Sequence, residues 1–377
     1  MLREENELLT RTGPGTAAGE MLRRYWWPVA IADQVTPGAP PQRVRLLSED
    51  LVLFRDRQGE LGLLGLHCSH RGTSLEYGRV EEAGIRCPYH GWLYNRSGRC
   101  LDQPAEPADN TYKDRIQHLA YRAEELGGLI FAYIGQAPAP LLPRYDLLVR
   151  TDGAKLVGRA SEPGNFNWLQ NAENTVDQAH LPFLHASVYP SMAMKRPECS
   201  WERTWYGIRA TTRIPGISTP KISINIFPSF NRFTAARVGT SPSHNMFFRV
   251  PVDDEHSDTL WVLFYPGVEQ SSLTERDLRP QKQRRVPHVY ERVDDGWWGI
   301  PSSEQDRMAV ETQGPVANRA SEHLASSDRG VVMLREMVKD AIEAVREGRD
   351  PVGVIRDVEE NEYLEFDDQM EEIGVLV

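Results

Sequence analysis

The segment HCSHRG at residues 67–72 and the segment CPYHGW at residues 87–92 together supply two cysteines and two histidines. Cys68 and His70 are separated by one residue and Cys87 and His90 by two, with sixteen residues between the pairs. Thiolates and imidazoles are strong ligands of transition metals. Strand-like runs flank both segments, so we expect two facing loops of a small β domain to clamp one metal centre from opposite sides.

Two kinds of metal centre accept this set of ligands. In a Rieske-type [2Fe–2S] cluster, two cysteines bind one iron and two histidines the other, which places the reduction potential at about −150 to +300 mV. A structural zinc site takes the same side chains in a tetrahedral array. Zinc sites usually open with two cysteines, so the C-x-H opening favours the cluster. A zinc-stabilised interaction module is the alternative.

Composition excludes several classes of protein. The chain has 377 residues and a net charge of −11, whereas nucleic-acid binding requires a basic face. No apolar run has the length of a transmembrane helix. The first residues are charged and lack the apolar core of a secretory signal. We therefore expect a cytoplasmic protein with no membrane and no nucleic-acid partner.

The order of segments predicts an α+β protein of two main domains. Residues 17–27 are expected to form a short helix, and residues 1–40 a lead-in. The strand-like runs 43–47, 51–55, 61–66 and 129–134 indicate an all-β domain over residues 41–143, which ends in the Pro-rich segment QAPAPLLP. In residues 144–377, strand-like residues 202–265 lie between the helical segments 165–180 and 303–347, and residues 270–300 are polar and irregular.

A second group of metal-binding side chains lies at Asp177, His180 and His185. Asp177 and His180 are expected to share a helix face because they are three residues apart. His185 would point away on an ideal helix, but Pro182 interrupts the helix and lets the chain turn back. Two histidines and a carboxylate form the facial triad of non-heme iron oxygenases. The alternative is that these histidines are merely packed or hydrogen-bonded at a helix end.

The third ligand has three candidates in the segment that begins at Ser303, namely Glu304, Asp306 and Glu311. Asp306 follows Ser303 by three residues, as in a capping box. An acid there can also simply compensate the helix dipole. The residues alone leave this choice open.

The metal motifs resemble those of one family. HCSHRG and CPYHGW resemble the Rieske fingerprint of the Rieske non-heme iron oxygenases, and N-x-x-D-x-x-H-x-x-x-x-H at 174–185 resembles their mononuclear-iron motif. Residues 5–30 and 305–332 are similar to the phthalate dioxygenase-type branch, so the resemblance covers nearly the whole chain. It implies a [2Fe–2S] cluster on the first four ligands, a second domain of the helix-grip type, and Fe(II) held by His180, His185 and Asp306.

The resemblance also implies how electrons reach the iron. Asp177 would join His180 to the partner subunit's His90 in a head-to-tail homotrimer, and Asn174 would lie near the iron or simply pack on its helix. The chain shows no G-x-G-x-x-G fingerprint, so NAD(P)H and flavin are expected on a separate iron–sulfur reductase, with or without a ferredoxin. O2 would be the co-substrate.

The expected reaction is hydroxylation or cis-dihydroxylation of an aromatic compound, most simply an aromatic carboxylate as for phthalate 4,5-dioxygenases. O-demethylation of a methoxy-aromatic, as by vanillate or dehydrodivanillate demethylases, is the alternative. A non-catalytic Rieske electron carrier is the second alternative, although a carrier needs only about 100 residues. The substrate-contact candidates, each of which could equally be a core or surface residue, are Arg232, Arg237, Arg249, His244 and Phe248.

Overall fold

The computed structural model describes residues 1–187, 189–235, 243–273, 300 and 302–366. Contacts divide the chain into two compact units, which are Arg23–Leu142 and the combination of Met1–Leu22 with Pro143–Val377. We call them the cysteine-containing unit and the helix–sheet unit, and describe each by itself. Leu142 and Pro143 belong to different units, and the domain bounds 1–40, 41–143 and 144–377 stay predictions.

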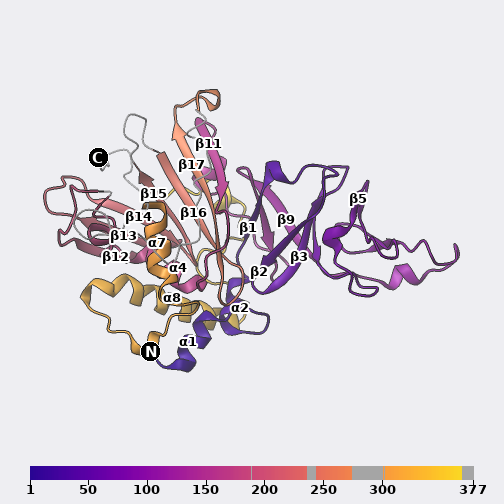
Figure 1. The fold of residues 1–377 in the computed structure, drawn as a ribbon, viewed down its shortest axis with the longest axis horizontal. Coiled ribbons are helices and arrows are strands. Elements are labelled where there is room, and N and C mark those ends of the chain that lie inside the picture. Colours follow the sequence, from indigo (N-terminus) through magenta and orange to yellow (C-terminus); the bar gives the residue numbers. More distant parts are fainter. Residues whose placement is uncertain (188, 236–242, 274–299, 301, 367–377) are drawn as a thin grey trace. The chain divides into compact units, whose positions relative to one another are not determined.

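The cysteine-containing unit is built from two antiparallel sheets (Figure 1). The larger has the order β1-β10-β9-β4-β3-β2, with β1 Trp27–Ile31, β2 Gln42–Leu46, β3 Glu49–Arg55, β4 Leu61–Gly65, β9 Ala120–Leu126 and β10 Leu129–Tyr133. The smaller has the order β5-β6-β7-β8, with β5 Arg79–Glu81, β6 Gly84–Arg86, β7 Leu93–Tyr94 and β8 Cys100–Asp102. The four strands predicted from the sequence are therefore confirmed as β2, β3, β4 and β10.

The predicted helix over residues 17–27 was too long. Helix α2 spans Ala17–Leu22, and Trp27 already belongs to β1. Aromatic side chains favour strands, and Pro28 is tolerated because β1 is an edge strand whose register shifts between Pro28 and Ala30.

The helix–sheet unit contains a seven-stranded antiparallel sheet in the order β11-β17-β16-β15-β14-β13-β12. Its strands are β11 Gly153–Arg159, β12 Glu198–Arg203, β13 Gly207–Arg213, β14 Lys221–Ile226, β15 Phe230–Ala235, β16 Ser243–Pro251 and β17 Ser257–Pro266. Its helices are α1 Arg3–Thr10, α2, α3 Asp146–Val149, α4 Trp168–Val176, α5 Leu181–Leu184, α7 Ser302–Glu311 and α8 Arg329–Arg346. The α+β prediction is confirmed.

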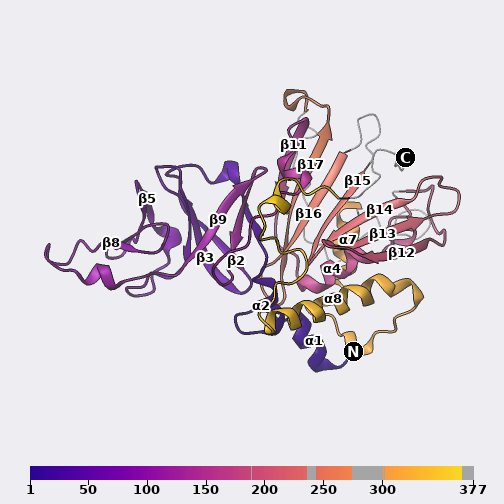
Figure 2. The ribbon, with the colours of Figure 1, turned by 180° about the vertical axis from the view of Figure 1, so that it is seen from behind.

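The helices pack against different strands of this sheet. Helices α4 and α7 contact each other and lie over one face, with α4 against β14 and β16, while α3 contacts β16 and β17. Helix α8 contacts β12 and β13 and lies beside them in both views (Figures 1 and 2). Helical structure was predicted across residues 303–347, but α7 ends at Glu311 and α8 begins only at Arg329.

Short 3-10 turns complete the described secondary structure. They span Ala32–Gln34, Leu75–Tyr77, Tyr112–Arg115, Gln270–Ser272, Arg319–Ser321, Ser326–Asp328 and Glu359–Asn361. Residues 274–299, most of the segment predicted to be irregular, lie outside the described residues. Within the described part of the chain, no helix combines the length and apolarity that a membrane span requires.

Candidate metal centres and the adjoining cavity

The two Cys–His pairs, Cys68 with His70 and Cys87 with His90, lie in two turns of matching geometry. The amide of Gly72 donates to the carbonyl of Cys68 at 2.8 Å, and the amide of Gly91 donates to the carbonyl of Cys87 at 3.1 Å. Both glycines have positive φ, +76° and +73°. Only glycine adopts this conformation without strain, which explains why each motif ends its turn with glycine.

The four side chains are arranged as two buried thiols and two partly exposed imidazoles. Cys68 and Cys87 are each 3% exposed, whereas the rings of His70 and His90 meet edge to face with centroids 4.5 Å apart. Burial raises the pKa of the Cys87 thiol. The Nδ1 atom of His70 is buried and has no hydrogen-bond partner among the described residues. Two thiols and two imidazoles in facing loops fit a Rieske cluster.

Side chains that the sequence analysis did not single out surround this centre. Trp92 stacks on His70, with centroids 4.5 Å apart and 6° between the planes. The Tyr94 hydroxyl lies 3.2 Å from the Cys68 sulfur, and burial raises the pKa of Tyr94 so that the hydroxyl keeps its proton. Hydrogen bonds to cluster sulfurs tune the potential of such centres.

The second histidine pair forms differently from the prediction. Helix α4 ends at Val176, and Asp177 is already extended, with ψ of 113°. Asp177 and His180 therefore do not share a helix face. Pro182 does not end the helix but lies in the first turn of α5, where its missing N–H is tolerated. The result is nevertheless the expected one, because His180 and His185 flank α5 with ring centroids 5.4 Å apart.

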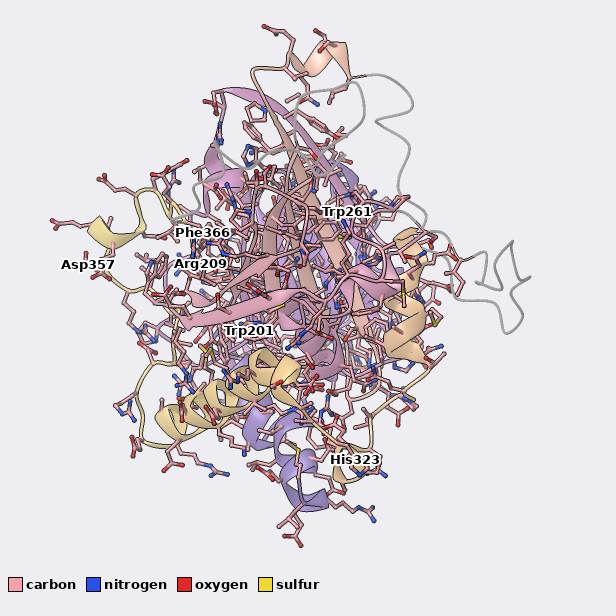
Figure 3. All side chains as sticks on the ribbon, turned by 90° about the vertical axis from the view of Figure 1, so that its left-hand side faces the viewer. Trp201, Arg209, Trp261, His323, Asp357 and Phe366 are labelled. Atoms are coloured by element: carbon pink, nitrogen blue, oxygen red, sulfur yellow. The ribbon has the colours of Figure 1, made fainter. Side chains whose placement is uncertain are left out.

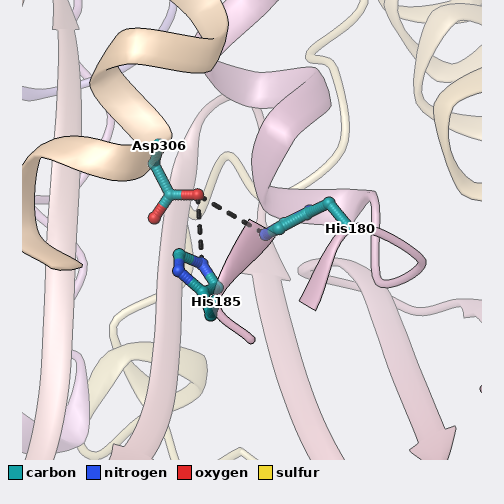
Figure 4. A group of neighbouring side chains, drawn as sticks. All are labelled: His180, His185 and Asp306. Carbon is teal, nitrogen blue, oxygen red and sulfur yellow. Dashed lines mark ion pairs between the residues drawn. The ribbon is translucent and has the colours of Figure 1, made fainter. Parts of the chain in front are cut away.

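The carboxylate of Asp306 completes this group (Figure 4). Its Oδ1 atom lies 3.5 Å from Nε2 of His180 and 3.3 Å from Nε2 of His185. Ligand atoms of the three residues all lie within 4.8 Å of one another, and among the described residues no other three His, Cys, Asp or Glu ligand atoms are this close together. Two imidazoles and a carboxylate that converge on one point fit a mononuclear iron site.

The two competing acids are placed elsewhere. Glu311 pairs with Arg307 at 3.0 Å and accepts a hydrogen bond from the amide of Asn165 at 3.0 Å. Glu304 is only 8% exposed and does not join the His180–His185 group. Asp306 lies in the interior of α7, past its first turn. The tertiary contacts thus bring one of the three acids to the histidines.

Neighbouring polar groups hold the metal-binding side chains in position. Nδ1 of His185 lies 2.7 Å from Oε1 of Gln305, whose amide nitrogen donates to Ser187 Oγ at 3.2 Å and to the Ile300 carbonyl at 3.1 Å. Because the Gln305 oxygen can only accept, Nδ1 of His185 carries the proton and Nε2 is left free for a metal. No sequence signal predicts this role for Gln305.

Asn174 and Asp177 lie beside the same group. The Asn174 amide donates to Oδ1 of Asp306 at 3.3 Å. Asp177 Oδ2 approaches Nδ1 of His180 to 3.7 Å, a distance longer than a hydrogen bond, so this imidazole nitrogen has no partner among the described residues. Its position is compatible with a contact that tightens when His180 binds a metal.

Asp306 is an acid held between two bases. Burial raises the pKa of Asp306, but the adjacent His185 and His180 imidazoles lower it more, so its pKa lies well below the usual range. Burial lowers the pKa of His185, but Asp306 raises it more, and the net direction is upward. The site favours a positive charge, which a divalent metal also supplies.

The His180–His185–Asp306 group opens into a cavity of about 580 Å³. The helices α4 and α7 provide one wall and alternate residues of the sheet the other. The sheet residues include Lys221 and Ser223 of β14, Asn231 and Phe233 of β15, and Asn245, Phe247 and Arg249 of β16. A cavity of this volume holds a small organic substrate.

Of the proposed substrate contacts, Arg249 lines this cavity. Arg232, His244 and Phe248 occupy the alternate positions of the same strands and so point to the opposite face. There Arg232 pairs with Asp146 at 2.5 Å, and Phe248 packs on Phe230 with centroids 4.9 Å apart. Arg237 lies outside the described residues.

Comparison with known proteins decides the family. The Rieske [2Fe-2S] domain family matches residues 25–116, and the family described as LigXa C-terminal domain like matches residues 289–368. The 5,5'-dehydrodivanillate O-demethylase oxygenase subunit of Sphingobium sp. (strain NBRC 103272 / SYK-6) is 33% identical, over 94% of this chain and 83% of its own length. The phenoxybenzoate dioxygenase subunit alpha of Ectopseudomonas oleovorans is 35% identical, over 92% of this chain and 87% of its own length.

This chain belongs to the Rieske non-heme iron oxygenases. It lies in the phthalate dioxygenase-type branch, since the phthalate 4,5-dioxygenase oxygenase subunit of Pseudomonas putida is 30% identical over 93% of this chain and 88% of its own length. Another relative is the tert-butanol monooxygenase / tert-amyl alcohol desaturase oxygenase subunit of Aquincola tertiaricarbonis. It is 36% identical over 92% of this chain and 78% of its own length.

A solved oxygenase structure supports the fold. The crystal structure of dicamba monooxygenase bound to dicamba has a TM-score of 0.67 and 15% identity, and the match covers 87% of this chain and 99% of that chain. The chain is thus the oxygenase subunit of a Rieske-type enzyme that uses a [2Fe–2S] cluster, a mononuclear iron and O2. An oxygenase subunit works with a reductase or ferredoxin that supplies its electrons.

Proposed function

We propose that this oxygenase subunit hydroxylates or cis-dihydroxylates an aromatic carboxylate. The observation that carries the proposal is that His180, His185 and Asp306 converge at a cavity that also contains aromatic side chains and a guanidinium. Phe233 and Phe247, stacked with centroids 5.7 Å apart, offer their ring surfaces to an aromatic substrate. Arg249 offers paired N–H donors to a carboxylate.

Each metal-binding residue has a proposed role. Cys68, His70, Cys87 and His90 would hold the cluster, and His180, His185 and Asp306 the iron. When bound, the cluster supplies single electrons and the iron supplies open coordination positions for O2. Gln305 keeps the His185 imidazole in the tautomer that leaves Nε2 free, and Asn174 orients Asp306 through its amide.

Asp177 and the assembly of subunits belong to the same proposal. The Asp177 side chain is 29% exposed and lies beside His180, so a second protein surface can reach it. We propose that it links His180 to the partner subunit's His90 in a head-to-tail homotrimer that receives electrons from a flavin- and iron–sulfur-containing reductase. The charge of Asp177 would hold the proton on the His180 imidazole it faces.

O-demethylation is the second candidate, because the relatives at similar identity include an O-demethylase as well as dioxygenases. A methyl ether seated at the same group would lose its methyl carbon as formaldehyde. The cavity residues are compatible with both outcomes. A neutral alcohol, such as the tert-butanol named for the Aquincola relative, matches this cavity less well, since it would leave the charge of Arg249 without a counterion.

The test is a single turnover. The protein, loaded with both iron centres, is reduced chemically and mixed with O2 and a panel of aromatic carboxylates with and without methoxy groups. Mass spectrometry should find a product that has gained two oxygens and two hydrogens, or one oxygen. Loss of a methyl group with matching formaldehyde would instead establish demethylation. No product from any carboxylate, with both centres occupied, would overturn the aromatic-carboxylate proposal.

A non-catalytic electron carrier is separated from an oxygenase by His180→Ala. The oxygenase loses turnover while it keeps the visible spectrum of the cluster, because the two centres use different ligands. A carrier would keep its electron-transfer rate in the same variant.

A further inference from the structure

The cavity contains a cation at each end of an aromatic platform, which consists of Phe233 and Phe247. Their rings are nearly parallel, with 9° between the planes. Nζ of Lys221 lies 5.7 Å from the centroid of Phe233, and Cζ of Arg249 lies 5.1 Å from the centroid of Phe247. Lys221 was not among the substrate contacts predicted from the sequence.

The strand register places the two cations apart along the sheet. Phe233 of β15 pairs with Asn245 of β16, two residues before Phe247, and Arg249 follows two residues later. Lys221 contacts the Phe233 end from β14, and Arg249 the Phe247 end. Since each residue of a strand advances about 3.4 Å, the backbone of Arg249 lies about 14 Å along β16 from that of Asn245, the partner of Phe233.

Neither cation is neutralised by the described protein. Lys221 and Arg249 form no side-chain hydrogen bond or ion pair with a described residue, and Nε of Arg249 is buried without a partner. Arg307, which also lines the cavity, is by contrast paired with Glu311 and with the carbonyls of Glu162 and Pro163. Burying a cation without a counterion is unfavourable.

Uncharged polar groups between the cations are also unsatisfied. The Oδ1 atoms of Asn231 and Asn245 have no partner among the described residues, although each side chain is about 6% exposed. Both line the cavity. Burial lowers the pKa of Lys221 to about 8 and that of Arg249 to about 10, while Asp306 partly opposes both shifts. Asp306 therefore lies within electrostatic reach of both ends.

We propose that this cavity binds an elongated aromatic dicarboxylate, with one carboxylate on Lys221, the other on Arg249, and the aromatic body on Phe233 and Phe247. This inference rests on the proposed function and specifies its substrate class. A charge-assisted hydrogen bond at each end would strengthen binding, so both Lys221 and Arg249 contribute to the affinity.

Direct binding tests the inference without turnover. Isothermal titration of the holoenzyme without O2 would compare biphenyl-4,4′-dicarboxylate, biphenyl-4-carboxylate and phthalate, whose carboxylates are adjacent. We expect the long dicarboxylate to bind about 10- to 100-fold more tightly than either of the others, as one further charge-assisted hydrogen bond provides. Equal affinity for the long dicarboxylate and the monocarboxylate would overturn the two-ended site, and tighter binding of phthalate would overturn the elongated shape.

Variants show which side chain is responsible. Lys221→Met and Arg249→Met should each reduce the dicarboxylate's advantage over the monocarboxylate to less than about threefold, and Lys221→Arg should restore it. Arg213→Met, an exposed position of β13 outside the cavity, should leave the ratio unchanged. A retained advantage in Lys221→Met would overturn the role of Lys221. Circular dichroism and the cluster spectrum establish that each variant is folded.

The two proposals fail in different experiments. If the long dicarboxylate binds as expected but no aromatic carboxylate is converted in the single turnover, the proposed reaction is wrong and the anion site stands. If a monocarboxylate is converted while the binding ratio is flat, the reaction stands and the two-ended site is wrong.

Discussion

Gln305 shows how one uncharged side chain can decide the state of a metal ligand. It accepts a hydrogen bond from Nδ1 of His185 and is itself held by Ser187 and Ile300. The imidazole therefore has one orientation and one tautomer before any metal arrives. The cost of ordering this ligand is met during folding rather than during metal binding.

Replacing Gln305 with leucine should weaken iron binding at the His180–His185–Asp306 group by about 10- to 100-fold, because His185 loses its acceptor. Chelator competition with Fe(II) under argon measures the dissociation constant. Gln313→Leu, an exposed position of the same segment, is the control. Unchanged affinity in Gln305→Leu would show that His185 is oriented by packing alone, and Gln305→Glu should restore binding.

A carboxylate beside the cysteine loops predicts a pH dependence. Glu81 of β5 accepts two hydrogen bonds from Arg86, at 2.8 and 3.0 Å, and these hold the pKa of Glu81 at about 2. Because the folded pKa lies below the unfolded value, the pair stabilises the fold above about pH 4.5, and this stabilisation is lost as the pH falls toward 2. Arg86 also donates to the Gly91 carbonyl, so the pair supports one cysteine loop.

We expect Glu81→Gln to lower the free energy of unfolding by about 1–2 kcal/mol at pH 7, and by progressively less toward pH 3. Thermal unfolding followed by the visible circular dichroism of the cluster measures the difference. Glu82→Gln, an exposed neighbour, serves as the control. A destabilisation that stays constant from pH 7 to pH 3 would contradict the assignment.

At the scale of elements, helix α4 is the part that connects the metal-binding group to the rest of the helix–sheet unit. Trp201 of β12, which is labelled in Figure 3, donates to the carbonyl of Val176 at 2.8 Å and lies against Gly330 of α8. In the middle of α4, Glu173 pairs with Arg319 at 2.7 Å and with Arg335 of α8 at 2.6 Å. These contacts fix the helix end from which the chain turns toward His180.

Removal of the Glu173 carboxylate leaves two buried arginines without their shared partner. Arg319 is 0% exposed and Arg335 7%, so Glu173→Ala should destabilise the protein by about 3–5 kcal/mol. Urea unfolding followed by far-ultraviolet circular dichroism measures this loss. The exposed pair Arg3–Glu7 provides the comparison, since Glu7→Ala should cost at most about 0.5 kcal/mol. Similar losses in both variants would mean that the network does not anchor α4.

At the scale of the whole molecule, the proposed trimer makes a prediction about mixed assemblies. A Cys87→Ala subunit should lack the cluster and a His180→Ala subunit should lack the iron. If electrons pass between subunits, coexpressed and doubly tagged hybrids should regain a substantial fraction of turnover, while each variant alone stays inactive. Hybrids that remain inactive, with both centres present by metal analysis, would place the transfer within one chain and overturn the role proposed for Asp177.

The sequence by itself determined the metal chemistry and the class of fold. The spacing of Cys68, His70, Cys87 and His90 specifies the ligands of one centre, and strand-like runs of residues identified four strands of the cysteine-containing unit. Local signals sufficed because turns and strands depend on neighbouring residues. The end of the helix at residues 17–27 was misplaced, since aromatic residues and an edge-strand proline joined a sheet whose other strands are distant in sequence.

The tertiary structure decided which distant side chains share a site. It separated Asp306 from Glu304 and Glu311, which lie on the same helix, by packing α7 against α4. It also divided the residues of β14, β15 and β16 between two faces, so that Lys221 and Arg249 line the cavity and Arg232, His244 and Phe248 do not. Strand alternation is visible in the sequence, but which face turns toward the metal depends on where the helices pack, and that is a property of the whole fold.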